Sequence, residues 1–550
     1  MRLRQICEKS PNTLHQMLIR GANAVGYTSY PDNVVKNFVD LSAKNGIDVF
    51  RIFDSLNSLD NMYETIQAVR ETGKIAEVAL CYTGDILDPS RPKYNLDYYV
   101  KMAKEIEKAG ANIIAIKDMA GLLKPEAAYT LVSALKDAVD IPVHLHTHDG
   151  AGNAVTTLCR AADAGVDIVD VAYASFAGGT SQPSMNSFYY AMSGKDRQPE
   201  MDTEAMEEMT RYWATVRPYY KGVDKAEPYP NTETYYCEMP GGQFSNLRQQ
   251  AKAVGLGDRW NDIKKMYHDV NLMFGDIVKV TPSSKVVGDM TLFMVQNNLT
   301  EKDIYEKGDT IDFPQSVVEF FEGRLGFPYG GFPEKLQKII LKGKKPLTQR
   351  PGKLLDPVDF EAVRKKLDDA GYGSTDEDIN AYCQYPKVFA DYSEKLKKYG
   401  DVSVLDTPTF FFGMKVNEEI TVQLEEGVQL IIRLVNISDP DDSGMRTITF
   451  MFNGAEREIQ VLDKSVSQTS VMTKKADPDK PGDIGATLSG SVVKVLVTKG
   501  QKVKKGDPLV VTEAMKMETT ITSPIDGVVG EIYAQKGKPI ISGDCLLEIE

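Results

Sequence analysis

Alternating histidines near residue 146 could hold a metal ion. His144, His146 and His148 occupy every second position of residues 143–149 and are three of the chain's five histidines. Residues two apart in a strand point to the same face, so His146 and His148 could face one ion together. Neutral imidazole is a ligand for Zn²⁺ and for ions such as Mn²⁺. His144 shares that face but lies deeper, and a histidine pair held by hydrogen bonds alone is the alternative.

Lys117 is a candidate third ligand, because it ends the preceding apolar run, Asn112–Lys117. A buried lysine is costly as a cation unless it is paired. Its ammonium form has no lone pair for a metal. An amine that has reacted with CO₂ would instead be an anionic oxygen ligand. A salt bridge to a neighbouring acid is the alternative interpretation.

Arg20 carries a side chain suited to a substrate carboxylate, and Thr281 stands at a candidate helix N-terminus. Arg20 ends the first apolar run, and a guanidinium there can hold a carboxylate by two parallel hydrogen bonds. Thr281 is followed by Pro-Ser-Ser, which is typical of a helix N-terminus. A hydroxyl whose pKa lies far from neutrality is a poor isolated base. From the residues alone, helix capping is the simpler interpretation of Thr281.

Lys516 stands between two methionines, inside an internal repeat. The pattern of residues 490–509 recurs at residues 527–546. Each copy has a Val/Ile/Leu-rich run, Lys-Gly, Gly-Asp and a second apolar run, so both read as short strands with Gly turns. We expect two similar four-stranded halves packed face to face as a small flattened barrel. Lys516 falls at the turn that joins the halves.

Six apolar runs lie between residues 13 and 175, and helical patterns such as Tyr99–Ala109 and Pro125–Val139 lie between them. This alternation predicts parallel βα units. Polar residues end several of the runs, where a TIM-type barrel places its chemistry. We therefore predict an α/β fold with a (β/α)₈ barrel whose first strands are missing; an open doubly wound sheet, with one switch point, is the alternative. The expected strands are Leu14–Arg20, Asp48–Phe53, Ile75–Tyr82, Asn112–Lys117, Pro142–His148 and Ile168–Ala172.

The remaining chain divides by composition. Residues 1–200 are assigned to the barrel, incomplete at its N-terminus, and 201–402 to a helical extension. Residues 403–465 are a small mixed α/β linking region whose Asn453-Gly454 pair predicts a hairpin turn. Residues 466–482 are a polar linker, and 483–550 are the C-terminal all-β domain.

Composition restricts the partners and the compartment. The net charge is −14, without a long basic run, which argues against nucleic acid and anionic membranes as partners. No apolar run is long enough to cross a membrane. The six cysteines are scattered, so neither a disulfide framework nor a cysteine metal site is expected. A reducing compartment follows: we expect the cytoplasm, with an organelle matrix as the alternative.

Two motifs resemble those of known families. The Ala-Met-Lys-Met sequence around Lys516 resembles the attachment signature of biotinyl (biotin carboxyl carrier) domains. That resemblance implies biotin on the side-chain nitrogen of Lys516; an unmodified lysine on a lipoyl-like fold is the alternative. The Lys117-Asp-Met-Ala segment, with His-x-His further on, resembles the carboxyltransferase domain of the pyruvate carboxylase family. It implies that a carboxylated Lys117 binds a divalent metal, Zn or Mn, with His146 and His148.

The same resemblance assigns further roles. Arg20 and Tyr27 match positions that contact the keto acid, and Thr281 matches a threonine that shuttles a proton between the methyl group of pyruvate and biotin. Residues 180–185 match a segment that we interpret as shaping the mouth of the site, and residues 238–247 match one to which we assign no chemistry. The implied reaction moves a carboxyl group from carboxybiotin to pyruvate and forms oxaloacetate.

Some features of that family are not matched. Its members have two strands before the one that ends in Arg20, and the first of these supplies a further metal ligand. They also use an ATP-dependent biotin carboxylase, which these residues do not include. We therefore expect a biotin carboxylase domain or subunit, a biotin protein ligase and a homo-oligomer as partners. The resemblance also implies that residues 403–465 link the carrier to the barrel and take part in tetramerisation. The alternatives are the α subunit of oxaloacetate decarboxylase, a transcarboxylase subunit, and a non-catalytic biotin carrier or assembly subunit.

Overall fold

The computed structural model describes residues 2–222, 230–441, 444–463, 474–477, 480–487, 489–514 and 517–550. The chain forms two compact units. The first contains Met1–Lys365, Thr375–Gln384 and Lys474–Glu550, and the second contains Lys366–Ser374 and Tyr385–Thr473.

A six-stranded parallel sheet lies at the centre of the N-terminal region. The strands pair strictly in chain order. A doubly wound sheet would reverse its order at a switch point, so the sequential order confirms the barrel-type arrangement. The strands are β1 (Gln16–Ile19), β2 (Val49–Ile52), β3 (Ile75–Cys81), β4 (Ile113–Asp118), β5 (Val143–Thr147) and β6 (Ile168–Val169).

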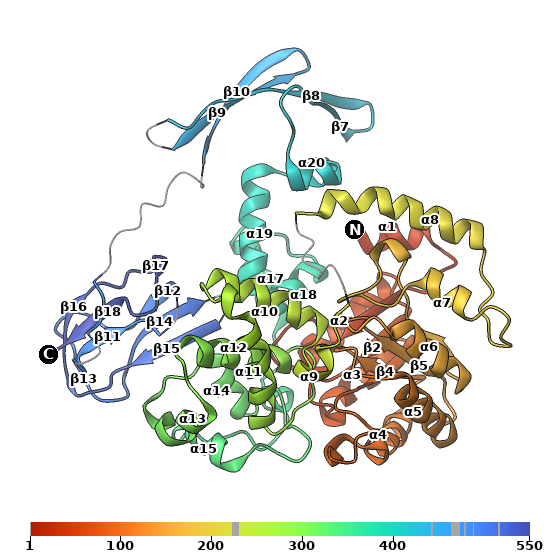
Figure 1. Cartoon of the computed structure of the whole chain (residues 1–550). Helices are drawn as coiled ribbons and strands as arrows, with labels where there is room; N and C mark the ends of the chain where they lie inside the picture. Colours follow the sequence, from red (N-terminus) through yellow and green to blue (C-terminus); the bar gives the residue numbers. More distant parts are fainter. Residues whose placement is uncertain are drawn as a thin grey trace. The chain divides into compact units, whose positions relative to one another are not determined.

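Amphipathic helices cover the outer side of this sheet (Figure 1). One example is α5, which starts with Pro125 in its first turn and buries the face formed by Ala128, Leu131 and Leu135. Gly110 and Gly165 follow helices with positive φ angles, as expected of helix C-termini. The helices of this region are α1 (Arg2–Lys9), α2 (Asp32–Lys44), α3 (Leu59–Glu71), α4 (Leu96–Lys108), α5 (Pro125–Ala138), α6 (Ala154–Asp163) and α7 (Met185–Ala191).

The first and last strands are shorter than the sequence predicts. The Arg20 amide donates to the carbonyl of Ala24, so the chain turns away after Ile19. Ala172 forms an isolated bridge with Ser184, and the ladder to β5 ends at Val169. The residues after β1 and after β6 therefore form hydrogen bonds within the loops that follow these strands. These loops lie at the carboxyl edge of the sheet.

The helical extension has its own hydrophobic core. Leu247, Tyr267, Met290 and Phe320 are fully buried there. Within the described residues, no helix is both long and apolar enough to span a bilayer. The helices from residue 203 to residue 384 are α8 (Thr203–Val216), α9 (Thr234–Cys237), α10 (Gly241–Ala253), α11 (Trp260–Met273), α12 (Ser283–Gln296), α13 (Glu301–Lys307), α14 (Gln315–Phe321), α15 (Glu334–Leu341), α16 (Pro351–Leu354), α17 (Phe360–Asp369) and α18 (Asp376–Gln384).

The second unit combines helices with an antiparallel sheet. It begins earlier than the boundary expected at residue 403, because residues 366–374 and 385–402, assigned above to the helical extension, belong to it. Asn453 and Gly454 have φ angles of 46° and 84°, which are typical of a two-residue hairpin turn. The sheet order is β10-β9-β8-β7. The elements are α19 (Pro386–Tyr399), α20 (Thr407–Phe412), β7 (Glu419–Glu425), β8 (Val428–Ile437), β9 (Met445–Phe452) and β10 (Ala455–Leu462).

The C-terminal domain consists of two four-stranded sheets, but they do not coincide with the two sequence repeats. The sheet orders are β11-β18-β16-β13 and β15-β14-β12-β17, so each sheet takes two strands from each half. This corrects the expectation of two separate halves packed face to face: the halves interlock through cross-half pairs such as β12–β17 and β13–β16. The strands are β11 (Asp483–Gly485), β12 (Gly490–Val495), β13 (Lys502–Val503), β14 (Pro508–Ala514), β15 (Met517–Thr522), β16 (Gly527–Ile532), β17 (Pro539–Ile540) and β18 (Cys545–Ile549).

The predicted biotin attachment residue lies outside the described residues. β14 ends at Ala514 and β15 begins at Met517, and Ala514 and Met517 are paired across the two strands. Lys516 belongs to the two residues between them.

Candidate functional site

His146 and His148 direct the same ring nitrogen toward each other. Their Nε2 atoms are 3.3 Å apart. The His148 Nδ1 lies 2.6 Å from the carbonyl oxygen of Thr180, which only accepts, so Nδ1 carries the proton. The His146 Nδ1 lies 2.6 Å from the Asp170 carboxylate. With both Nδ1 atoms donating, two Nε2 lone pairs face each other.

Two facing lone pairs suit a shared cation. If both nitrogens bound a tetrahedral ion at about 2.1 Å, they would lie about 3.4 Å apart. An N–H···N hydrogen bond between the rings would require one imidazolium. Burial disfavours that form: it lowers the pKa of His146 to about 3 and that of His148 to about 4. Both rings are therefore neutral at pH 7, the form in which imidazole binds metals.

Lys117 lies directly across from His146, because the two residues are register partners in β4 and β5. Its side chain is buried, with Nζ 5.0 Å from the centroid of the Phe53 ring. Burial lowers the pKa of Lys117 to about 8. At pH 8 about half of the side chain is therefore the neutral amine, the form that reacts with CO₂. Two neutral imidazoles and an amine that can gain an anionic oxygen form a donor set that fits Zn²⁺ or Mn²⁺.

Arg20 and Tyr27 also lie together, beside Lys117. The Arg20 guanidinium lies 5.4 Å from the Tyr27 ring centroid and 5.9 Å from that of Phe53. Its Nη1 donates to the carbonyl of Val25 at 2.8 Å. Both cationic side chains, Arg20 and Lys117, thus lie close to the Phe53 ring.

Thr281 lies just before α12, and its hydroxyl does not cap that helix. The N-cap residue is Pro282, which makes no side-chain cap. The Thr281 Oγ1 is 3.4 Å from the Ser284 Oγ. Ser283 instead donates to backbone carbonyls, 2.7 Å from that of Val280. The Thr281 hydroxyl is therefore not used to cap the helix. Thr281 and Tyr27 line the same cleft, and Tyr27 lies beside Arg20.

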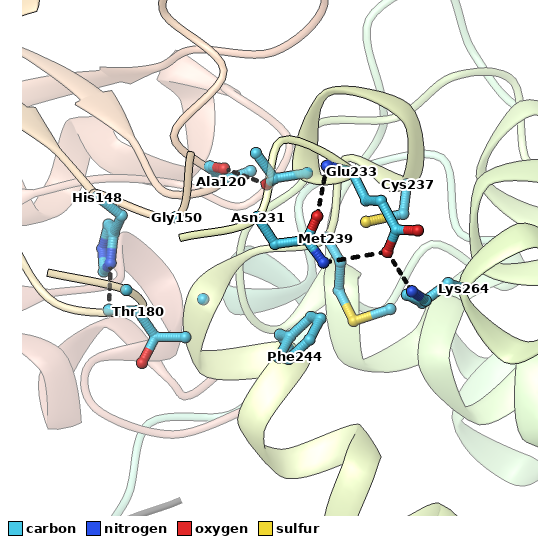
Figure 2. A pocket seen from close by; sticks show the side chains of 13 residues that line it. Ala120, His148, Gly150, Thr180, Asn231, Glu233, Cys237, Met239, Phe244 and Lys264 are labelled. Atoms are coloured by element: carbon cyan, nitrogen blue, oxygen red, sulfur yellow. Dashed lines mark hydrogen bonds and ion pairs between the residues drawn. The ribbon is translucent and has the colours of Figure 1, made fainter. Parts of the chain in front are cut away.

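A pocket adjoins the His148 side of the site. Figure 2 shows His148 and Thr180 along one part of its wall and Met239 and Phe244, from the helical extension, along another. The same figure shows the hydrogen bond between the ring of His148 and the backbone of Thr180. The extension therefore closes the site beside His148.

Two aspartates that end strands do not join the site. Asp54 accepts from the amides of Leu56 and Ser58, and Asp118 accepts from those of Leu122 and Leu123. These bonds turn both carboxylates into their own loops. Burial raises the pKa of each to about 6.

Asp170 is the residue of this site that we did not predict from the sequence. It follows β6, and its carboxylate contacts His146 at 2.6 Å and His144 at 2.8 Å. Arg51 forms an ion pair with it. Burial opposes ionisation, but the bonds from His144, His146 and Arg51 hold the pKa of Asp170 well below its usual range. The expected strand Ile168–Ala172 hides this residue, because it places Asp170 in mid-strand, whereas β6 ends at Val169.

Three family models match different parts of the chain. A model described as "HMGL-like" matches residues 47–212, "Conserved carboxylase domain" matches 234–433, and "Biotin-requiring enzyme" matches 480–549. The first lies over the parallel sheet, the second over most of the helical extension and part of the second unit, and the third over the interlocked β domain.

Curated relatives match the whole chain. Pyruvate carboxylase of Bacillus subtilis is 58% identical over 550 residues, and that of Staphylococcus aureus is 54% identical over 551. Both alignments cover 100% of this chain and 48% of the relative. The chain therefore spans about half the length of the curated relatives that it matches.

Solved structures of pyruvate carboxylase also match this chain. The carboxyl transferase domain of Rhizobium etli pyruvate carboxylase, solved with pyruvate and biocytin, is 49% identical, with a TM-score of 0.80. The match covers 84% of this chain and 78% of that one. The complete multifunctional enzyme of the same organism matches at the same TM-score over 46% of its length. The sequential sheet, the helical extension and the biotin-requiring domain thus occur together in one known group of proteins, and the chain belongs to the pyruvate carboxylase family.

Proposed function

We propose that this chain transfers a carboxyl group from biotin on Lys516 to pyruvate and so forms oxaloacetate. The observation that carries the proposal is the convergence of the His146 and His148 Nε2 atoms opposite Lys117, beside Arg20, at one edge of the sheet. The relatives named pyruvate carboxylase support the choice of substrates. The match to a biotin-requiring domain supports the carrier.

Lys117, His146 and His148 are proposed to hold a divalent metal, Zn²⁺ or Mn²⁺, with Lys117 carboxylated. When bound, the metal would supply positive charge where the substrate oxygen becomes negative. The chain supplies the setting for this: both imidazoles are kept neutral by burial, and the lysine amine is partly unprotonated near pH 8.

Arg20 is proposed to bind the carboxylate of the keto acid, with Tyr27 beside it. A guanidinium can hold a carboxylate by two hydrogen bonds and fix its plane. The rings of Tyr27 and Phe53 lie beside the guanidinium, at 5.4 Å and 5.9 Å. The methyl carbon of the substrate is then held in a fixed position for proton removal.

Thr281 is proposed to relay the proton. Its oxygen takes a proton from the methyl group of pyruvate while its own hydroxyl proton moves on to the ring nitrogen of biotin that lost the carboxyl group. Because one proton arrives as the other leaves, the hydroxyl never carries a full charge, and its high pKa is no obstacle. The resulting enolate of pyruvate forms a carbon–carbon bond with the released CO₂.

Several partners follow from this function. A biotin carboxylase would load the carboxyl group, a biotin protein ligase would modify Lys516, and a homo-oligomer would be the working assembly. We place the protein in a reducing compartment, the cytoplasm or an organelle matrix, because all six cysteines are free. The human relative is named as mitochondrial.

Thr281→Ala in the biotin-loaded protein tests this function. We expect carboxyl transfer, followed as biotin-dependent oxaloacetate decarboxylation, to fall about 10²- to 10⁴-fold, which is the usual contribution of acid–base catalysis. Thr281→Ser keeps the hydroxyl and should retain most of the rate. Equal rates for wild type and Thr281→Ala would remove Thr281 from the mechanism. A requirement for sodium and a membrane partner would instead favour the oxaloacetate decarboxylase alternative, and a complete absence of transfer by wild type would favour a carrier role.

A further inference from the structure

We propose that Asp170 is the positioning residue that makes His146 competent to bind a metal, by fixing the tautomer of its ring. This inference rests on the metal centre proposed above. His148 is fixed by a backbone carbonyl, that of Thr180, whereas His146 depends on a side chain. The metal centre is therefore sensitive to the identity of one residue outside its ligand set.

The Asp170 carboxylate uses both oxygens. Oδ2 lies 2.6 Å from the His146 Nδ1, and Oδ1 lies 2.8 Å from the His144 Nε2. Arg51 pairs with the same carboxylate. A carboxylate only accepts hydrogen bonds, so the His146 Nδ1 must carry the proton and its Nε2 must keep the lone pair.

Arg51 makes this arrangement necessary. Its Nη1 lies 3.3 Å from the His146 Nδ1, and a guanidinium only donates. If the carboxylate were removed, Arg51 could donate to the His146 Nδ1, and the proton of the ring would move to Nε2. The lone pair would then point away from His148. Asp170 therefore keeps the proton of His146 on Nδ1, although the neighbouring Arg51 would favour the tautomer with the proton on Nε2.

A buried cluster one step further into the barrel holds Asp170 and Arg51 in place. Arg51 pairs with Glu77, and the Gln16 side chain donates to Glu77 at 2.6 Å. The His144 ring lies between Glu77 and Asp170. Arg51, Glu77 and His144 are each less than 5% exposed. Side chains from four other strands, β1, β2, β3 and β5, thus fix the position of the carboxylate.

Asp170→Asn is the informative change, because an amide has one accepting oxygen and one donating nitrogen. Its single oxygen can replace only one of the two carboxylate contacts, so either the His146 Nδ1 or the His144 Nε2 loses the acceptor that holds its proton. We expect the affinity of the metal-free protein for Zn²⁺ or Mn²⁺, measured by calorimetric titration, to fall about 10- to 100-fold, as is usual when the partner of a ligating histidine is lost. Metal content after purification should fall in parallel.

Two controls separate positioning from general structure. Asp167→Asn removes a carboxylate from the same segment that pairs with Lys136 at 2.8 Å and accepts from the Val143 amide, at the opposite end of β5. It should leave metal affinity unchanged. Glu77→Gln disturbs the buried cluster without touching His146 and should weaken binding less than Asp170→Asn. Equal losses for Glu77→Gln and Asp170→Asn, or unchanged affinity for Asp170→Asn, would overturn the proposal.

The tautomer can also be read directly. In metal-free wild type with ¹⁵N-labelled histidine, NMR should show the His146 proton on Nδ1; a proton on Nε2 would overturn the proposal, even if Asp170→Asn fails to fold. If wild type binds neither ion, the metal centre proposed above fails, and the NMR result still decides the role of Asp170.

Discussion

Residues of the same type have different roles here, depending on the hydrogen-bond partners of their side chains. His146 and His148 each engage Nδ1 with an oxygen and leave Nε2 available. Asp54 follows its strand as Asp170 follows β6, but it accepts from the Leu56 and Ser58 amides and the Asn61 side chain and is fully buried. Asp54 therefore shapes a loop, whereas Asp170 contacts the site.

The burial of Asp54 predicts a pH-dependent cost to stability. Burial raises its pKa to about 6 from 3.8, so the folded state holds the proton more tightly than the unfolded state does. The protein is then most stable with respect to this group below pH 4, and that stability is lost as the pH rises through 6. The rise in the pKa of Asp54 from 3.8 to about 6 corresponds to a free-energy difference of about 3 kcal/mol between the two protonation states. Between pH 4 and pH 7, the unfolding free energy of wild type should fall by about that amount relative to Asp54→Asn, measured by urea denaturation. A difference that stays constant with pH would show that Asp54 is ionised throughout.

At the residue scale, the sequence indicated His146, His148 and Lys117 as neighbours. It did not indicate Asp170, which orients His146. Strand periodicity was enough to place His146 and His148 on one face, and the apolar run was enough to bury Lys117. The role of Asp170 depends on β6 lying beside β5 and on the reach of Arg51 from β2, which are tertiary facts. The family resemblance, rather than periodicity, pointed to Thr281.

At the element scale, loops between strands and helices position the site. The loop between β3 and α4 supplies Arg91, which pairs with Glu238 and Asp276 of the helical extension. Lys279, two residues before Thr281, is buried and pairs with the same two acids. The segment that carries Thr281 is therefore fixed to the barrel by a cluster of opposite charges.

Glu238→Gln should destabilise this junction. It leaves Arg91 and Lys279 to share Asp276 alone, and removing one partner from a buried ion pair costs on the order of 3 kcal/mol. Thermal or urea unfolding should show the loss, and carboxyl transfer should fall as Thr281 shifts. Glu361→Gln is a matched control, because Glu361 is 80% exposed in its pair with Arg364 and should cost less than about 1 kcal/mol. Similar losses for both variants would argue against the junction.

The elements themselves were largely predictable. The predicted helix Pro125–Val139 is observed as Pro125–Ala138, and the order of the six strands follows from unbroken βα alternation. The interlocking of the C-terminal repeats was not predictable, because a 37-residue offset such as that from Gly490 to Gly527 shows which segments are equivalent, not which of them pair. The same pattern of apolar runs fits both arrangements.

At the scale of the whole molecule, the proposed reaction needs the carrier to remain attached to the carboxyltransferase part. The predicted linker, residues 466–482, is shorter than its composition indicates: Lys475 bridges to Asp544 and the Ile549 amide donates to Gly482, so both residues belong to the C-terminal domain. What connects Asp463 to Lys474 lies outside the described residues. A short flexible linker holds its partner at an effective concentration on the order of millimolar. Attachment rather than strong binding is then what brings biotin to the site.

Cutting the linker should therefore make the reaction depend on concentration. A specific protease site inserted between Asp463 and Lys474 would leave the interlocked β domain intact, because its described strands begin at Asp483. After cleavage at micromolar protein, carboxyl transfer should fall by about 10²-fold or more and should recover when the free biotinylated carrier is added toward millimolar concentration. The uncut protein with the same insertion is the control and should keep its rate at every dilution. If the cut protein keeps its full rate at micromolar concentration, the carrier is held by a stable interface rather than by its tether, and Lys516 would then work from a docked position.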